Sequence, residues 1–145
     1  MKKSKKSNIR FSALWVVGLI VLTLIGAVLV INLSKNGSNI STPSEISVSE
    51  AHEMRSAGAF ILDVREPQEW QAGHIPGATL IPLGELESRL SELPTDQEIV
   101  VVCRSGNRSA TGRDILKKAG FENTTSMAGG MNSWINLGYD VVNGP

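Results

Sequence analysis

Residues 99–109 have the sequence Ile-Val-Val-Val-Cys-Arg-Ser-Gly-Asn-Arg-Ser and contain Cys103, the only cysteine in the 145 residues. The β-branched run at the start of this stretch predicts a short buried strand. The pattern of apolar residues from Ser109 to Ala119 predicts a helix. Cys103 is therefore expected at the turn between a strand and a helix.

The residues around Cys103 favour a negative charge on its sulfur. Consecutive backbone N–H groups in such a turn, together with the positive end of the following helix, attract anions. Arg104 and Arg108 add two guanidinium groups. A thiol in these surroundings has a lowered pKa and acts as a nucleophile. A free cysteine can instead be an inert core residue, but an inert residue needs none of these neighbours, so we expect a reactive thiol.

The N-terminal 45 residues differ in composition from the rest of the chain. Residues 1–10 contain five basic side chains, and residues 11–33 contain no charged residue. As a helix, residues 11–33 would span about 35 Å, which is enough to cross a lipid bilayer. We expect a basic tail, one transmembrane helix, and a flexible linker at residues 34–45, where turn-forming residues are frequent.

A cleaved signal peptide is the alternative for this N-terminal segment, because it also begins with a basic stretch. The apolar region of a signal peptide is usually about 7 to 15 residues long, and no Ala-x-Ala cleavage site follows here. We therefore expect an uncleaved single-pass anchor in the cell membrane. Since the basic residues precede the span, the N-terminus is expected in the cytoplasm and the folded domain outside it.

Residues 46–145 have the size of one compact domain. Strand patterns alternate with helical patterns along them, which predicts an α/β fold with a mostly parallel sheet covered by helices on both faces. In such a sheet, ligands bind beyond the carboxyl ends of the strands, where Cys103 is expected. The expected strands are 46–48, 60–64, 78–81, 98–102 and 124–127, and the expected helices are one before Gly58 and those at 67–73, 83–93, 109–119 and 131–135.

Charge and residue counts argue against two classes of partner. The formal net charge of the chain is zero, and the domain is mildly acidic without its basic tail, which argues against nucleic acid. The chain has two histidines and one cysteine. They show none of the paired spacings of a zinc centre, so no metal site is expected.

Some polar and aromatic residues outside the cysteine loop are expected to be structural. Asp63 and Arg65 follow the second strand and are expected to form an ion pair at its end. We expect His74 to pack within a turn. Trp70 and Trp134 are expected in the core.

Three stretches of the domain resemble the rhodanese domains, which are sulfurtransferases that carry a sulfur atom on a cysteine as a persulfide. They are residues 62–78, the loop at 103–109, and Gly129-Gly130 with Trp134 and Gly138. They span nearly the whole domain in the family's order. The resemblance implies a rhodanese-like α/β fold with a sheet of about five strands.

The resemblance also implies a mechanism, in which Cys103 is the catalytic nucleophile. Its thiolate takes the outer sulfur of thiosulfate or a related small anionic donor, and passes it to a thiol or cyanide acceptor without a cofactor. Ser105 stands where classical thiosulfate sulfurtransferases have a second basic residue, so sulfur transfer is better supported than a preference for thiosulfate. The expected substrate-binding residues are those of the loop: Arg104, Ser105, Gly106, Asn107, Arg108 and Ser109.

Two other classes of function fit parts of the sequence. Cysteine phosphatases and arsenate reductases also hold a thiolate in an anion-binding loop closed by an arginine. Here, however, the segment between Cys103 and Arg108 is one residue shorter than in those phosphatases, and Val102 stands where they usually have a histidine. The other alternative is a module that faces the cell envelope and delivers persulfide to a protein partner, or docks one.

Overall fold

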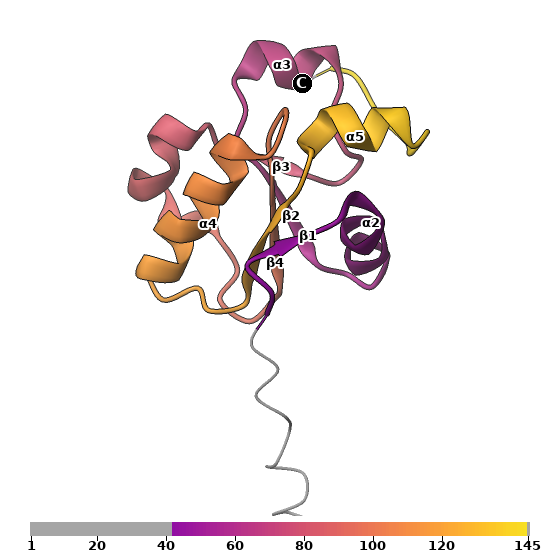
Figure 1. The fold of residues 1–145 in the computed structure, drawn as a ribbon. Helices are drawn as coiled ribbons and strands as arrows, with labels where there is room; N and C mark the ends of the chain where they lie inside the picture. Colours follow the sequence, from indigo (N-terminus) through magenta and orange to yellow (C-terminus); the bar gives the residue numbers. More distant parts are fainter. Residues whose placement is uncertain (1–41, 145) are drawn as a thin grey trace, which may run out of the picture. The chain divides into compact units, whose positions relative to one another are not determined.

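The computed structural model of the protein describes residues 42–144. The expected basic tail at 1–10, the transmembrane helix at 11–33 and most of the expected linker lie outside these residues. Among residues 42–144, no helix has both the length and the apolar character needed to span a bilayer. Helices and strands alternate along this part of the chain (Figure 1).

Five parallel strands form the sheet, in the order β1-β5-β4-β2-β3. Strand β4 lies in the middle and pairs with β2 on one side and β5 on the other. This position explains why all four of its residues are buried, because a central parallel strand is covered on both faces. The strands are β1 (Glu45–Ile46), β2 (Phe60–Asp63), β3 (Thr79–Leu80), β4 (Ile99–Val102) and β5 (Thr124–Met127).

Helices cover both faces of the sheet, with α4 on one face and α2 and α5 on the other (Figure 1). Successive residues of β4 alternate between the two resulting cores. Val100 and Val102 pack on the side of α2 and α5, whereas Ile99, Val101 and Cys103 pack on the side of α4. The helices are α2 (Val48–Ser56), α3 (Pro67–Ala72), α4 (Asn107–Lys118) and α5 (Gly130–Asn136), with two 3₁₀ helices, η1 (Leu83–Ser88) and η2 (Leu90–Glu92).

Local sequence signals fix several helix ends. Ser47 and Glu50 form a reciprocal capping box at the start of α2, with N···O distances of 3.2 and 2.8 Å. At the end of α4, Gly120 has φ +97°. The backbone N–H of Phe121 donates to the carbonyl of Leu116 at 3.0 Å, which completes a Schellman motif. The helix therefore ends in a left-handed glycine cap.

The structure corrects four sequence-based expectations. Residues 83–93 form two 3₁₀ helices instead of one α-helix. Leu83 and the buried Leu86 are three residues apart, and this spacing fits a 3₁₀ helix as well as an α-helix. The spacing therefore does not distinguish the two helix types. Val48 begins α2 rather than ending β1. The third strand is limited to Thr79–Leu80. The helix expected at 131–135 begins one residue earlier and ends one residue later, at Gly130 and Asn136.

Candidate active site

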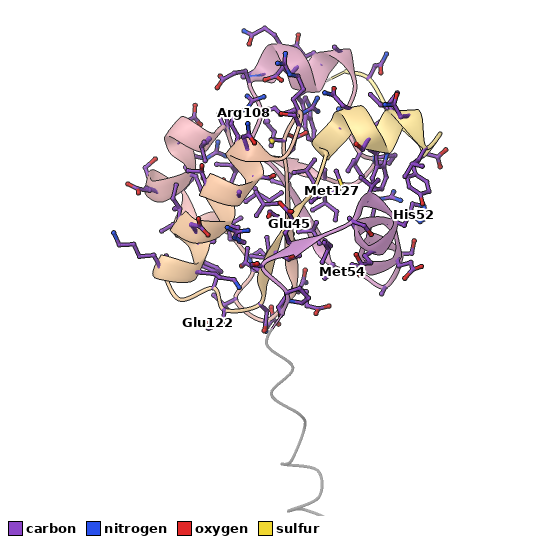
Figure 2. The ribbon with its side chains drawn as sticks, in the orientation of Figure 1. Glu45, His52, Met54, Arg108, Glu122 and Met127 are labelled. Carbon is purple, nitrogen blue, oxygen red and sulfur yellow. The ribbon has the colours of Figure 1, made fainter. Side chains whose placement is uncertain are left out.

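Cys103 lies directly after β4, and α4 begins four residues later at Asn107. This places the cysteine at the carboxyl end of the central strand, as the sequence predicts. Figure 2 shows Arg108 at the end of α4 that faces α3, whereas Glu122 lies beyond the other end of α4. The loop at 103–106 therefore joins the middle of the sheet to the amino end of α4.

Hydrogen-bond donors of the loop surround the Cys103 sulfur. The backbone N–H of Gly106 donates to Sγ at 3.1 Å, and the Ser109 hydroxyl oxygen lies 3.6 Å from Sγ. That hydroxyl donates to the Gly106 carbonyl at 2.7 Å, and it can rotate towards the sulfur when the thiol loses its proton. Gly106 has φ +107°, and a Cβ there would lie 3.3 Å from the backbone nitrogen of Gly129. Glycine is therefore required for this turn.

The pKa of the Cys103 thiol lies below its ordinary value. Burial is the largest single influence and raises the pKa, since Cys103 has no exposed surface. Hydrogen bonds from the side chain and backbone of Ser109 and from the backbone of Ser105 and Gly106 together outweigh burial. The lowered pKa agrees with the direction expected from the sequence, and the backbone N–H groups of the turn, which were expected to favour the anion, are among its causes.

Helix α5 fixes the backbone of the loop through two hydrogen bonds to its carbonyls. The N–H of Met131 donates to the Cys103 carbonyl at 2.8 Å, and the N–H of Asn132 donates to the Arg104 carbonyl at 3.0 Å. Gly130 has φ +56°, and a Cβ at this position would collide with the Cys103 carbonyl oxygen. These two hydrogen bonds fix the backbone at Cys103 and Arg104. The N–H groups of Ser105 and Gly106, which act on the sulfur, follow directly after this fixed segment.

The two arginines of the loop have different surroundings. The side chain of Arg104 is exposed. Arg108 forms a two-pronged ion pair with Glu69 of α3, with both N···O distances at 2.8 Å. Hydrogen bonding to Arg108 is the main reason that the pKa of Glu69 falls to about 2. Sequence reasoning missed Glu69, although it lies within one of the stretches that carry the family resemblance.

Helix α3 is fixed at the end of β2 by a buried ion pair. The carboxylate of Asp63 accepts from the guanidinium of Arg65 at 2.6 Å, and both side chains are almost fully buried. Arg65 also donates to the carbonyls of Gly73 and Glu69. The expected structural ion pair is confirmed. It fixes the backbone that carries the Glu69 carboxylate.

The packing expected of the aromatic residues is confirmed. The ring of His74 stacks on Trp70, with centroids 3.5 Å apart and planes 7° apart. Its Nδ1 lies 3.0 Å from the Trp70 carbonyl oxygen. Trp70 and Trp134 are both buried. In the part of the chain that the structure describes, no three His, Cys, Asp or Glu side chains are grouped as metal ligands.

Residues 47–137 match the family model for the Rhodanese-like domain. The chain belongs to this family. A putative sulfur carrier protein of Bacillus subtilis, YrkF, is 40% identical over 102 residues, which are 68% of this chain and 55% of that protein. The thiosulfate sulfurtransferase GlpE of Pseudomonas entomophila is 36% identical over 89 residues, 61% of this chain and 82% of GlpE. This chain thus spans about half of the first relative's length.

Solved rhodanese structures have the same architecture. The crystal structure of a rhodanese-related protein from Thermoplasma volcanium is 37% identical, with a TM-score of 0.65, and the match covers 69% of this chain and 98% of that one. Human TSTD1, a single-domain sulfurtransferase, is 28% identical with a TM-score of 0.61, over 65% of this chain and 96% of TSTD1. Relatives of this rhodanese-like domain are thus named for transferring or carrying sulfur.

The rhodanese-like domain brings together some of the predicted site residues but not all. Backbone donors from Ser105, Gly106 and Ser109 act on the sulfur of Cys103. Arg108 is close enough to Cys103 for their charges to interact. Three of the predicted substrate-binding residues have exposed side chains at the rim of the loop: Arg104, Ser105 and Asn107.

Proposed function

We propose that the protein is a sulfurtransferase that carries sulfur as a persulfide on Cys103. The observation that supports this proposal best is the set of donors around Sγ, in which the Gly106 N–H lies at 3.1 Å and Ser109 Oγ at 3.6 Å. A thiolate and a persulfide are both anions, so the same donors stabilise the nucleophile and the intermediate.

In the proposed loading step, the Cys103 thiolate attacks the outer sulfur of a donor. With thiosulfate, a new S–S bond forms at Cys103 while the S–S bond of thiosulfate breaks, and sulfite leaves with the bonding electron pair. In the second step, cyanide or a thiolate attacks the terminal sulfur of the persulfide. Thiocyanate or a new persulfide leaves, and the Cys103 thiolate is regenerated. The sulfur atom is transferred without any further oxidant or reductant.

Access to the sulfur requires a movement at the rim of the loop, because Cys103 is fully enclosed. Arg108 and Glu69 are each about one third exposed, at 32% and 27%. They are therefore the partly exposed charged side chains at the rim of the loop that holds the enclosed sulfur. A movement of this pair would let a donor's outer sulfur reach Cys103.

Intact-mass spectrometry of the full-length chain after thiosulfate treatment tests the covalent step. We expect a gain of about 32 Da, the mass of one sulfur, which cyanide removes as thiocyanate. Cys103→Ser should abolish both the mass gain and thiocyanate formation. The same preparation is offered p-nitrophenyl phosphate, and phosphate release without any thiocyanate would replace this proposal with the phosphatase alternative.

A second candidate function is delivery of the persulfide to a protein acceptor, suggested by the relative that is named a sulfur carrier. In that case thiosulfate or another donor loads Cys103, but small acceptors remove the sulfur slowly. Single-turnover measurements separate the two functions. Rapid loading followed by slow discharge to cyanide and to cysteine would favour delivery, whereas rapid discharge favours the enzyme.

We propose, from the sequence alone, that residues 11–33 anchor the protein in the cell membrane and that the domain lies outside the cytoplasm. The basic residues at 1–10 and the uncharged apolar segment after them support this arrangement. Protease treatment of intact spheroplasts provides the test. Digestion of the domain without lysis is expected, and protection until lysis would overturn the orientation.

A further inference from the structure

The Glu69–Arg108 pair joins two elements that are far apart in the sequence, next to the reactive sulfur. Glu69 lies on α3 and Arg108 on α4, 39 residues later. Both terminal nitrogens of the guanidinium donate to the carboxylate, at 2.8 Å each. A guanidinium held in this way has the edge that binds anions through two parallel N–H groups already occupied.

The Glu69 carboxylate is held in position by its own helix as well. Its Oε2 accepts from the backbone N–H of Glu66 at 3.2 Å. Its backbone carbonyl accepts from Arg65, which is anchored by the buried Asp63. The carboxylate therefore has a defined place beside Arg108 and is not a freely moving surface charge.

Glu69 changes the net charge that a sulfur donor meets at the rim of the loop. Two positive side chains, Arg104 and Arg108, follow the nucleophile. Two negative side chains, Glu66 and Glu69, act on Arg108 from α3 and its amino end. These four charges sum to zero, so the arginines add little net positive charge where a donor approaches. A dianion therefore gains little from the arginines.

We propose that Glu69 determines the charge of the sulfur donor, disfavouring dianions such as thiosulfate and favouring organic persulfides with at most one net negative charge. This inference rests on the proposed function. With such a donor, the Cys103 thiolate attacks the outer sulfur, the donor's S–S bond breaks, and the remaining organic thiolate leaves with the electron pair. Glu69 acts through Arg108, so it is a positioning residue.

Alkylation of Cys103 tests the electrostatic part of the proposal without any sulfur transfer. Iodoacetate and iodoacetamide both form an S–C bond as iodide leaves, and they differ by one negative charge. In the full-length protein, Glu69→Gln should raise the ratio of the iodoacetate rate to the iodoacetamide rate about threefold at low ionic strength, and less at high salt. Access to the sulfur affects both reagents alike, so it cancels in the ratio.

Matched variants identify the source of the change. Glu53→Gln removes the same charge from an exposed position on α2, and it should leave the ratio unchanged. Arg108→Gln should lower the ratio, and the double variant Glu69→Gln with Arg108→Gln should return it towards the wild-type value. An unchanged ratio in folded Glu69→Gln would overturn the proposal. If Glu69→Gln does not fold, an unchanged ratio in Arg108→Gln would do so.

The donor part is tested with thiosulfate and cysteine persulfide, which also differ by one net charge. The wild-type protein should load Cys103 with a higher kcat/KM from cysteine persulfide. Glu69→Gln should shift the ratio of the two values towards thiosulfate by a similar factor of about three. A wild-type preference for thiosulfate would overturn this part. Failure of both donors to load Cys103 would refute the proposed function, while the alkylation ratio would still report the role of Glu69.

Discussion

Two arginine–carboxylate pairs lie close together in this domain, and they differ in burial. Asp63 and Arg65 are 1% and 5% exposed and lie at the end of β2. Glu69 and Arg108 are 27% and 32% exposed, and Arg108 lies close enough to Cys103 for their charges to interact. In the first pair, Arg65 also donates to two backbone carbonyls. In the second pair, the additional hydrogen bond is from the backbone N–H of Glu66, at the amino end of α3, to the Glu69 carboxylate.

This difference in burial separates the roles of the two pairs. A buried charge that loses its partner has no water to replace it, so the cost appears in the stability of the fold. A partly exposed pair contributes little to stability because water and salt screen it. Its charges still act on the neighbouring thiol. We therefore expect changes in the first pair to affect folding, and changes in the second to affect reactivity.

The largest effect is expected from Asp63→Ala, which leaves the Arg65 guanidinium buried without its carboxylate. The free energy of unfolding, measured in urea, should fall by about 3–5 kcal/mol. Replacing both residues, as Asp63→Ala with Arg65→Met, should restore part of that loss because no unpaired charge remains. A loss below about 1 kcal/mol in the single variant would contradict the structural role of the pair.

Ser109→Ala should have the next largest effect, on the thiol and not on either ion pair. It removes the only side-chain donor close to Sγ among the described residues, so the pKa of Cys103 should rise. The pH midpoint of iodoacetamide alkylation measures this shift. Ser105→Ala keeps its backbone donor and serves as the control. Equal midpoints in Ser109→Ala and the wild type would show that the backbone alone ionises the thiol.

Glu69→Gln should have a small, pH-dependent effect on stability. The pKa of Glu69 falls from 4.5 to about 2 on folding, so its pair with Arg108 stabilises the fold above pH 4.5. That contribution is lost as the pH falls through this interval towards 2. At pH 7 we expect a cost of about 1 kcal/mol or less.

Thermal unfolding at pH 7 and pH 3 should show this stability difference between wild type and Glu69→Gln shrinking at the lower pH. Glu53→Gln should show no such pH dependence. A difference that grows on acidification would be inconsistent with the lowered pKa of Glu69.

The smallest effect is expected from a third arginine, which is about as exposed as Arg108 but pairs with more exposed carboxylates. Arg89 contacts Glu85 and Glu92 at 2.9 and 2.7 Å, and these carboxylates are about half exposed. Because solvent and salt screen these two carboxylates, Arg89→Gln should leave both the unfolding midpoint and the alkylation ratio of Cys103 unchanged. A loss comparable to that of Asp63→Ala would show that burial does not separate the pairs.

The parts of the fold that depend on local interactions could be predicted from the sequence. The β-branched run before Cys103 forms the central strand. Ser47 caps the start of α2 and Gly120 follows the end of α4, and both residue types favour these positions. Leu83 and Leu86 misled the helix assignment, because a spacing of three residues occurs in both helix types. The choice between them depends on packing against the rest of the domain, which the local pattern does not contain.

The same limit applies to the candidate site. The Asp63–Arg65 pair, whose members are two residues apart, could be predicted. The partner of Arg108 could not, because Glu69 precedes it by 39 residues and meets it only once α3 and α4 pack at the same end of the sheet. Sequence reasoning therefore placed Cys103 and the donors around its sulfur correctly, but overestimated the positive charge around them.

The support that α5 gives to the loop has a consequence for how this chemistry can be reused. The carbonyls of Cys103 and Arg104 are bound by Met131 and Asn132, almost thirty residues further along the chain. A peptide containing only the loop would keep the thiol and its N–H donors but lose the two hydrogen bonds from α5 that fix the loop backbone. The reactivity of this cysteine therefore cannot be transplanted as a short motif, and a graft onto another scaffold must bring an equivalent of α5 with it.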